Sequence, residues 1–171
     1  FGLFICGLIT SLAGGPIREV MLGNIPAYLT DPHYVVVAEL GTGSALLLYK
    51  HWNRTLPFFL VIDALGLATF AYIGAARADA FGLSAIAIVF FATITAVGGG
   101  IIRDIALREI PLVFQSDFYA TPAALLGILY ATLRGQFPEA ALAYGLVFLI
   151  FLVRLVAIRF KLHLWTPEPN S

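Results

Sequence analysis

The sequence predicts an all-α integral membrane protein, and its composition, its long uncharged segments and an internal repeat carry this prediction. The chain of 171 residues is 60% hydrophobic and 12% charged, with a mean hydropathy of +0.93. A soluble domain is about half apolar and about a quarter charged, so the additional apolar side chains here require lipid around them. The apolar segments are continuous rather than alternating, which argues against transmembrane strands.

Charge, cysteine content and missing motifs exclude several classes of function. Ten basic and ten acidic residues cancel, so no global positive field attracts nucleic acid. The single cysteine, Cys6, excludes an intramolecular disulfide. The sequence lacks the zinc-protease, nucleophile-elbow and phosphate-loop motifs, so we expect neither an enzyme nor a cofactor.

Six segments are long and apolar enough to cross a bilayer, which takes about 20 residues per helix. Proline, glycine, asparagine and charged residues, as in KHWNRT, RADA and RGQFPE, mark the connections between them. The predicted spans cover residues 1–22, 33–49, 57–76, 81–107, 112–133 and 138–160.

An internal repeat relates two stretches of the chain. AGGPIREVMLGNIP, residues 13–26, aligns at a constant offset with GGGIIRDIALREIP, residues 98–111. A glycine pair, an arginine, an acid and a proline fall in register. A chance alignment of two apolar stretches does not explain such a match. The aligned pairs include Gly14 with Gly99, Gly15 with Gly100, Arg18 with Arg103, Glu19 with Asp104, and Pro26 with Pro111.

The spacing of the repeat predicts the topology. Three membrane crossings separate the two glycine stretches, and an odd number inverts the second copy relative to the first. We therefore expect an inverted repeat of three plus three helices with 138–160 as a seventh, and with the first helix missing from this chain. Within a single membrane domain, 1–171, the expected units are the second and third helices of a truncated first repeat (1–55), the second repeat (56–134), and the seventh helix with a cytoplasmic tail (135–171).

Basic residues predict the orientation of the chain in the membrane. Short loops on the cytoplasmic side of a membrane are enriched in Lys and Arg. This bias places the C-terminus in the cytoplasm. One side receives Lys50, Arg54, Arg108, Arg159 and Lys161, whereas the other receives Arg77 and Arg134.

The repeated glycines predict helices that are broken and face a pore. Glycine costs about 1 kcal/mol relative to alanine inside a helix, so two copies of the motif indicate that a regular helix is unwanted there. Backbone carbonyls freed at Gly14, Gly15, Gly98, Gly99 and Gly100 would replace part of the hydration shell of a cation. The alternative is close packing, because small residues are typical of helix contacts in membranes.

The charged pairs Arg18–Glu19 and Arg103–Asp104 lie one turn beyond the glycines. An isolated charge at the bilayer centre costs at least ~2.5–3.5 kcal/mol, so we expect these residues to pair or to face water, in a gating or structural role. Snorkelling of the arginines to the headgroups is the alternative. Asp63, an isolated acid in an apolar segment, either attracts cations or bonds to a neighbouring helix.

The stretch GGGIIRDIALREIP, together with DALGLATFAYIGAARA at residues 63–78, resembles the prokaryotic TRIC proteins. These are trimeric intracellular cation channels, and the same domain is also labelled a glycine transporter. The resemblance covers essentially the whole chain. It implies seven helices in an inverted arrangement, a homotrimer in the prokaryotic inner membrane among its lipids, and a potassium-permeable pore in each protomer.

In that family the pore helices are kinked at glycines, and these map onto Gly14, Gly15 and residues 98–100. The arginine and the acid after each kink map onto the two charged pairs described above. A secondary transporter of a small zwitterion such as glycine is the alternative function. A broken helix serves both, because the N-terminus of a half-helix attracts a carboxylate whereas freed carbonyls hold a cation.

Overall fold

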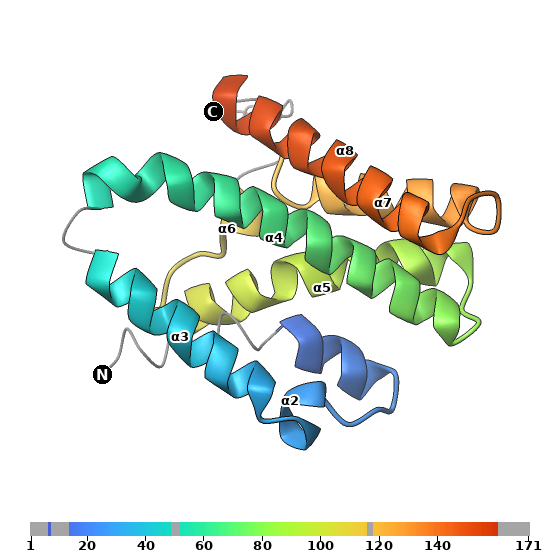
Figure 1. Ribbon diagram of the computed structural model, residues 1–171, viewed down its shortest axis with the longest axis horizontal. Coiled ribbons are helices and arrows are strands. Elements are labelled where there is room, and N and C mark those ends of the chain that lie inside the picture. Colours follow the sequence, from blue (N-terminus) through green and yellow to red (C-terminus); the bar gives the residue numbers. More distant parts are fainter. Residues whose placement is uncertain (1–6, 8–13, 49–51, 116–117, 161–171) are drawn as a thin grey trace, which may run out of the picture.

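The computed structural model describes residues 7, 14–48, 52–115 and 118–160, and all regular structure within these ranges is helical (Figure 1). The prediction of an all-α fold is therefore confirmed. A helical segment over 14–21 opens the described chain. It is followed by α2 (Ala27–Thr30), α3 (His33–Leu48), α4 (Trp52–Ala80), α5 (Ala85–Ala106), α6 (Leu112–Gln115), α7 (Thr121–Leu133) and α8 (Glu139–Phe160).

Three of the described helices are long and apolar enough to cross a membrane. They are Leu60–Ala80 within α4, Ala85–Ala106, and Glu139–Phe160, whereas α7 is apolar but shorter. The span predicted over residues 112–133 is wrong as a single helix, because the chain forms α6 and then starts again at α7. Pro122 lies in the first turn of α7. Proline lacks a backbone N–H and is favoured at a helix start, so it separates the two helices.

The connection predicted at RADA is also misplaced. These residues belong to α4, which continues to Ala80 because alanine and arginine are good helix formers. The turn lies instead at Gly82, whose positive φ of 68° suits glycine. Ser84 then caps α5 by accepting a hydrogen bond from the backbone N–H of Ala87. At its other end α4 begins at Trp52, inside the predicted loop KHWNRT.

Small residues bring the central helices into close contact. Five alanines of α4 are completely buried, and the helix packs against α5, α7 and α8. A Cβ atom added to Gly74 of α4 would lie 2.2 Å from the carbonyl oxygen of Phe91 in α5, and one added to Gly127 of α7 would lie 2.7 Å from Cα of Val89. Helix contacts of this kind are typical of membrane bundles. The five alanines are Ala64, Ala68, Ala71, Ala75 and Ala78.

The internal repeat is present in the backbone itself. At the offset that aligns Gly14 with Gly99, the short helix α2 falls exactly on α6. Left-handed Gly23 (φ 71°) falls on Arg108, a non-glycine residue that also has a positive φ of 61°. The backbone hydrogen bonds coincide as well: Leu22 to Arg18, Asn24 to Glu19 and Leu29 to Pro26 in the first copy, and Leu107 to Arg103, Glu109 to Asp104 and Phe114 to Pro111 in the second.

The two copies run in opposite directions, as the spacing predicts. Figure 1 shows the segment 14–21 antiparallel to α5, and α3 antiparallel to α7. The fold is therefore an inverted repeat followed by α8. The segment 14–21, α4 and α5 border one cavity, and this cavity is the candidate functional site.

Candidate functional site

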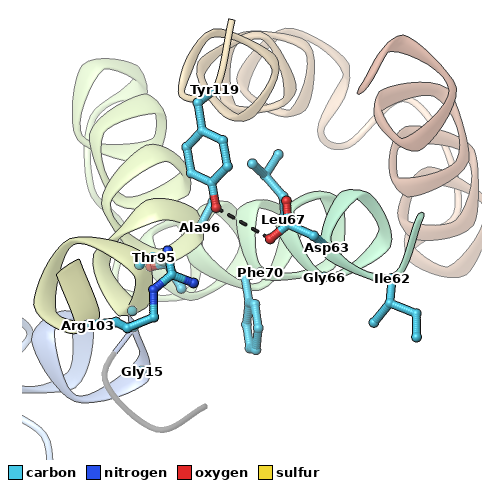
Figure 2. A pocket seen from close by; sticks show the side chains of 13 residues that line it. Gly15, Ile62, Asp63, Gly66, Leu67, Phe70, Thr95, Ala96, Arg103 and Tyr119 are labelled. Atoms are coloured by element: carbon cyan, nitrogen blue, oxygen red, sulfur yellow. Dashed lines mark hydrogen bonds between the residues drawn. The ribbon is translucent and has the colours of Figure 1, made fainter. Parts of the chain in front are cut away.

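A cavity of about 230 Å³ lies where the two copies of the glycine motif meet (Figure 2). The segment 14–21, α4, α5 and Tyr119, which precedes α7, form its walls. Most of the wall is apolar, and four side chains bring polar groups to it: Asp63, Thr95, Arg103 and Tyr119. The remaining lining residues are Gly14, Gly15, Ile62, Gly66, Leu67, Phe70, Ala96, Gly99 and Gly100.

The cavity brings together six of the ten site residues predicted from the sequence. These are Gly14, Gly15, Asp63, Gly99, Gly100 and Arg103. The other four, Arg18, Glu19, Gly98 and Asp104, do not line it. Within the described ranges, no group of three His, Cys, Asp or Glu side chains is placed to hold a metal ion.

The helix carrying the second glycine motif is not broken. The helix α5 runs without interruption from Ala85 to Ala106, through Gly98, Gly99 and Gly100. Carbonyls inside a continuous α-helix accept hydrogen bonds from the N–H groups four residues later, so these glycines do not free them. The expected break is therefore wrong for α5. In the first copy, residues 8–13 lie outside the described residues, and Gly14 and Gly15 are themselves helical.

The glycines divide instead into two kinds by their surroundings. A Cβ atom on Gly14 would lie 2.6 Å from the carbonyl oxygen of Thr95, and one on Gly98 would lie 2.9 Å from Cδ1 of Ile17. These two glycines allow the segment 14–21 and α5 to touch, as the packing alternative predicts. Gly15 has no such neighbour within 4 Å, and Gly100 has only contacts of ordinary length, such as Tyr119 Oη at 3.7 Å. Their missing side chains leave space in the cavity.

The first charged pair belongs to a cluster that joins two helices. Glu19, which is 3% exposed, lies 2.7 Å from Nη2 of Arg18 and 3.2 Å from Nη2 of Arg77 in α4. The amide of Asn24 donates a further hydrogen bond to Glu19. We call these four residues the Glu19 cluster. It satisfies a buried carboxylate and ties the segment 14–21 to α4.

The second charged pair brings one of its two residues, Arg103, to the cavity wall. Nη2 and Nε of Arg103 both lie 2.8 Å from Oδ1 of Asp104, which is 3% exposed. The prediction that both arginines pair or face water is thus confirmed, because each pairs with the carboxylate that follows it. Arg103 reaches the cavity, as Figure 2 shows, and its pairing lowers the electrostatic barrier that a free positive charge would present to a cation.

Asp63, a residue of α4, lines the cavity, and its carboxylate is contacted by Tyr119. The hydroxyl of Tyr119 donates to Oδ1 of Asp63 across 3.5 Å, a long hydrogen bond (Figure 2). The guanidinium of Arg154 in α8 lies 4.8 Å from the centre of the Tyr119 ring. Its Nη1 donates to the carbonyl oxygen of Phe118 at 3.0 Å.

Sequence reasoning did not identify Tyr119 or Arg154 as site residues. A signal was available for Arg154, which is a lone charge within the apolar stretch FLIFLVRLVAI of the last predicted span. Tyr119 gave a weaker signal, which is its alignment with Tyr34 in the repeat.

The family model described as Glycine transporter matches residues 1–50 and 60–135. The chain belongs to this family, the TRIC family. The resemblance drawn from the two glycine motifs is confirmed. The match spans both copies of the repeat.

Curated relatives of this TRIC-family chain are membrane proteins. A UPF0126 membrane protein of Vibrio cholerae is 38% identical over 170 residues, which cover 97% of this chain and 71% of the relative. The UPF0126 inner membrane protein YadS of Escherichia coli K12 is 37% identical over 171 residues, covering 97% and 82%.

Solved structures of cation channels share the fold. One, described as a structural basis for conductance through TRIC cation channels, superposes with a TM-score of 0.84 at 27% identity, covering 99% of this chain and 96% of that one. A prokaryotic TRIC channel crystallised in 0.5 M KCl gives a TM-score of 0.83 at 32% identity, covering 92% and 81%. The TRIC orthologue from Rhodobacter sphaeroides gives 0.79 at 27%, covering 94% and 95%.

Proposed function

We propose that this TRIC-family chain is a passive channel for monovalent cations, with potassium as the main permeating ion. We further propose that the ion path runs through the cavity of each protomer. The observation that carries the proposal is the position of Asp63, a carboxylate open to a cavity at the crossing of the two glycine motifs. The likeness to solved cation channels supports the same function.

The chemistry of the cavity suits a weakly held cation. Asp63 attracts positive charge, and the hydroxyl of Tyr119 offers a further oxygen. Oγ1 of Thr95 is buried and has no hydrogen-bond partner among the described residues. Because α5 is continuous, we infer that potassium is coordinated by these side-chain oxygens and by water rather than by freed carbonyls.

Gly15 and Gly100 keep this path open, whereas Gly14 and Gly98 set the helix crossing beside it. We infer that the Glu19 cluster holds the segment 14–21 in place, and that Asp104 neutralises Arg103 at the wall. An ion pair in either position would also serve a gate, because breaking it would expose an arginine to the permeating ion.

We further propose that the chain works as a homotrimer in a prokaryotic inner membrane, with its C-terminus in the cytoplasm. One solved relative is described as a trimeric channel, and YadS is an inner membrane protein. Large apolar side chains, such as Ile86 at 84% exposed, cover the outside of the single chain and require lipid or neighbouring protomers. The excess of basic residues in the loops on one side supports this orientation.

Single-channel recording of the full chain in planar bilayers tests the proposal. We expect unitary potassium currents, with Asp63→Asn lowering the current at low potassium concentration because the carboxylate no longer attracts cations. Glu39→Gln, on an exposed position of α3, is the matched control and should leave the current unchanged. Absence of unitary currents, or equal behaviour of both variants, would contradict the proposed path.

A secondary transporter of a small zwitterion such as glycine is the second candidate. The family description supports it, and so does the presence of both a carboxylate, Asp63, and a guanidinium, Arg103, at one small cavity. These groups would bind the ammonium and the carboxylate of an amino acid. Saturable glycine uptake into proteoliposomes without unitary currents would favour this function over a channel.

A further inference from the structure

Arg154 is a buried charge that the proposed path does not itself require. It lies within α8, a helix of 22 residues, nearer to its C-terminal end, and is 8% exposed. An arginine inside a membrane helix is costly unless it is paired or serves a site, so its surroundings need an explanation. The helix α8 contributes no residue to the cavity wall.

The contacts of Arg154 all lead toward the cavity. Its Nη1 binds the carbonyl oxygen of Phe118, and its guanidinium stacks over the ring of Tyr119. Nε of Arg154 has no hydrogen-bond partner among the described residues. Tyr119 is itself 9% exposed, and Figure 2 shows its hydroxyl end directed at Asp63. Arg154 therefore contacts the ring of Tyr119, while the hydroxyl of the same tyrosine contacts Asp63.

Electrostatics connects the same residues. Asp63 interacts through space with two positive charges, Arg154 and Arg103. The charge of Arg103 is already engaged by Asp104 at 2.8 Å. Arg154, in contrast, forms no ion pair among the described residues, and it lies behind the aromatic ring rather than at the cavity wall.

We propose that Arg154 is a positioning residue that sets how tightly the cavity holds a permeating cation. It keeps the Tyr119 hydroxyl beside Asp63, and its charge offsets part of the attraction that Asp63 exerts. The inference rests on the proposed cation channel. A conducting site must attract an ion enough to admit it and hold it weakly enough to release it, and Arg154 supplies the second condition.

Potassium currents of the full chain, measured as a function of potassium concentration, test this role. In Arg154→Gln the half-saturating concentration should fall on the order of tenfold, and the maximal current should fall too, because the ion leaves more slowly. Arg154→Lys keeps the charge and should restore most of the wild-type half-saturation. Arg159→Gln removes an exposed arginine from the last turn of the same helix and should leave half-saturation unchanged.

Coupling to Asp63 separates this role from a purely structural one. If Arg154 acts by offsetting Asp63, the fall in half-saturation should disappear when Arg154→Gln is added to Asp63→Asn. Should Arg154→Gln not fold, Arg154→His replaces it, because its half-saturation should fall as the pH rises and the imidazole loses its charge. The wild type over the same pH range is the control.

Three results would overturn the inference while leaving the channel intact. These are an unchanged half-saturation in Arg154→Gln, the same shift in the Asp63→Asn background, and an equal shift in Arg159→Gln. For Arg154→His, a half-saturation that follows the wild type at every pH has the same meaning. If the wild-type chain itself passes no potassium current, the proposed function fails first, and the two failures are thereby distinguished.

Discussion

The two copies of the repeat have the same backbone conformation at the ends of their glycine-containing helices, but their surroundings differ. In the first copy, Glu19 is bound by Arg18 and by Arg77 of α4, so the charged pair fastens two helices together. In the second copy, Arg103 pairs with Asp104 and reaches the cavity. The hydrogen bonds that end the two helices are nevertheless the same.

The aligned tyrosines differ in the same way. Tyr34 is 56% exposed in the single chain, whereas Tyr119 is 9% exposed and lies between Arg154 and Asp63. The helix α8 follows the second copy only, and it supplies the arginine. The two copies therefore share the local backbone and both border the cavity, whereas the neighbours of each copy determine whether its charged pair joins two helices or reaches the cavity.

Breaking the Glu19 cluster should have the largest effect on stability. Glu19→Gln leaves Arg18 without its carboxylate in a buried site, which costs about 3 kcal/mol. The matched control, Glu39→Gln on the exposed side of α3, should change stability by less than about 0.5 kcal/mol. Thermal unfolding of the purified protein in detergent measures both. Equal stability of the two variants would show that the Glu19 cluster does not hold the segment 14–21 against α4.

Gly14→Ala should be the next most damaging change. The new methyl group would lie 2.6 Å from a backbone carbonyl of α5, which cannot move aside as a side chain does. Overpacking of this kind costs about 2 kcal/mol. Gly98→Ala meets only the flexible end of Ile17, so its cost should be smaller. The same unfolding assay compares them, and a reversed order would contradict the assignment of Gly14 to the helix crossing.

Gly100→Ala should affect conduction rather than folding. Its methyl group meets only contacts of ordinary length, and alanine favours the continuous helix α5 by about 1 kcal/mol. The protein should therefore be as stable as the wild type or more so, while the narrower cavity carries less potassium current. A destabilised variant with an unchanged unitary current would make Gly100 a packing residue like Gly14.

Tyr119→Phe tests the tyrosine difference on a smaller scale. The ring stays over Arg154 but loses its long contact with Asp63, so stability should change by less than about 1 kcal/mol. Unitary current should change, whereas Tyr34→Phe in the first copy should alter neither property. If both variants changed the current equally, the two copies would contribute alike.

The smallest effect is expected at the start of α3, outside the membrane-spanning helices. The backbone N–H of His33 donates to Asp31 at 3.0 Å, and this bond lowers the pKa of the Asp31 carboxyl. A lowered pKa in the folded state adds stability above the unfolded pKa, and that stability is lost as the pH falls through the folded value. Asp31→Asn should remove this small acid-side dependence from unfolding curves recorded between neutral and acidic pH. The aligned residue in the second copy is Ser116, which has no charge to lose.

The sequence by itself determined the membrane class, the repeat and the inverted topology. Transfer of apolar segments into lipid depends on composition and length, and the direction of each copy depends only on the number of crossings. Its errors were local. Pro122 favours a new helix start, so α7 begins within the predicted span 112–133. The residues of RADA favour helix, so α4 continues through the predicted connection.

Only the tertiary structure decided what each glycine and each charge contacts. Gly14, Gly15, Gly98 and Gly100 have the same chemistry, and nothing in their order separates those that touch a neighbouring helix from those that border a cavity. Arg77 and Arg154 lie far along the chain from Glu19 and Tyr119, which they contact. Helix propensity and hydropathy are properties of neighbours in sequence. The crossing point of two helices depends on side-chain packing between segments distant in the chain, and the candidate site lies at that crossing.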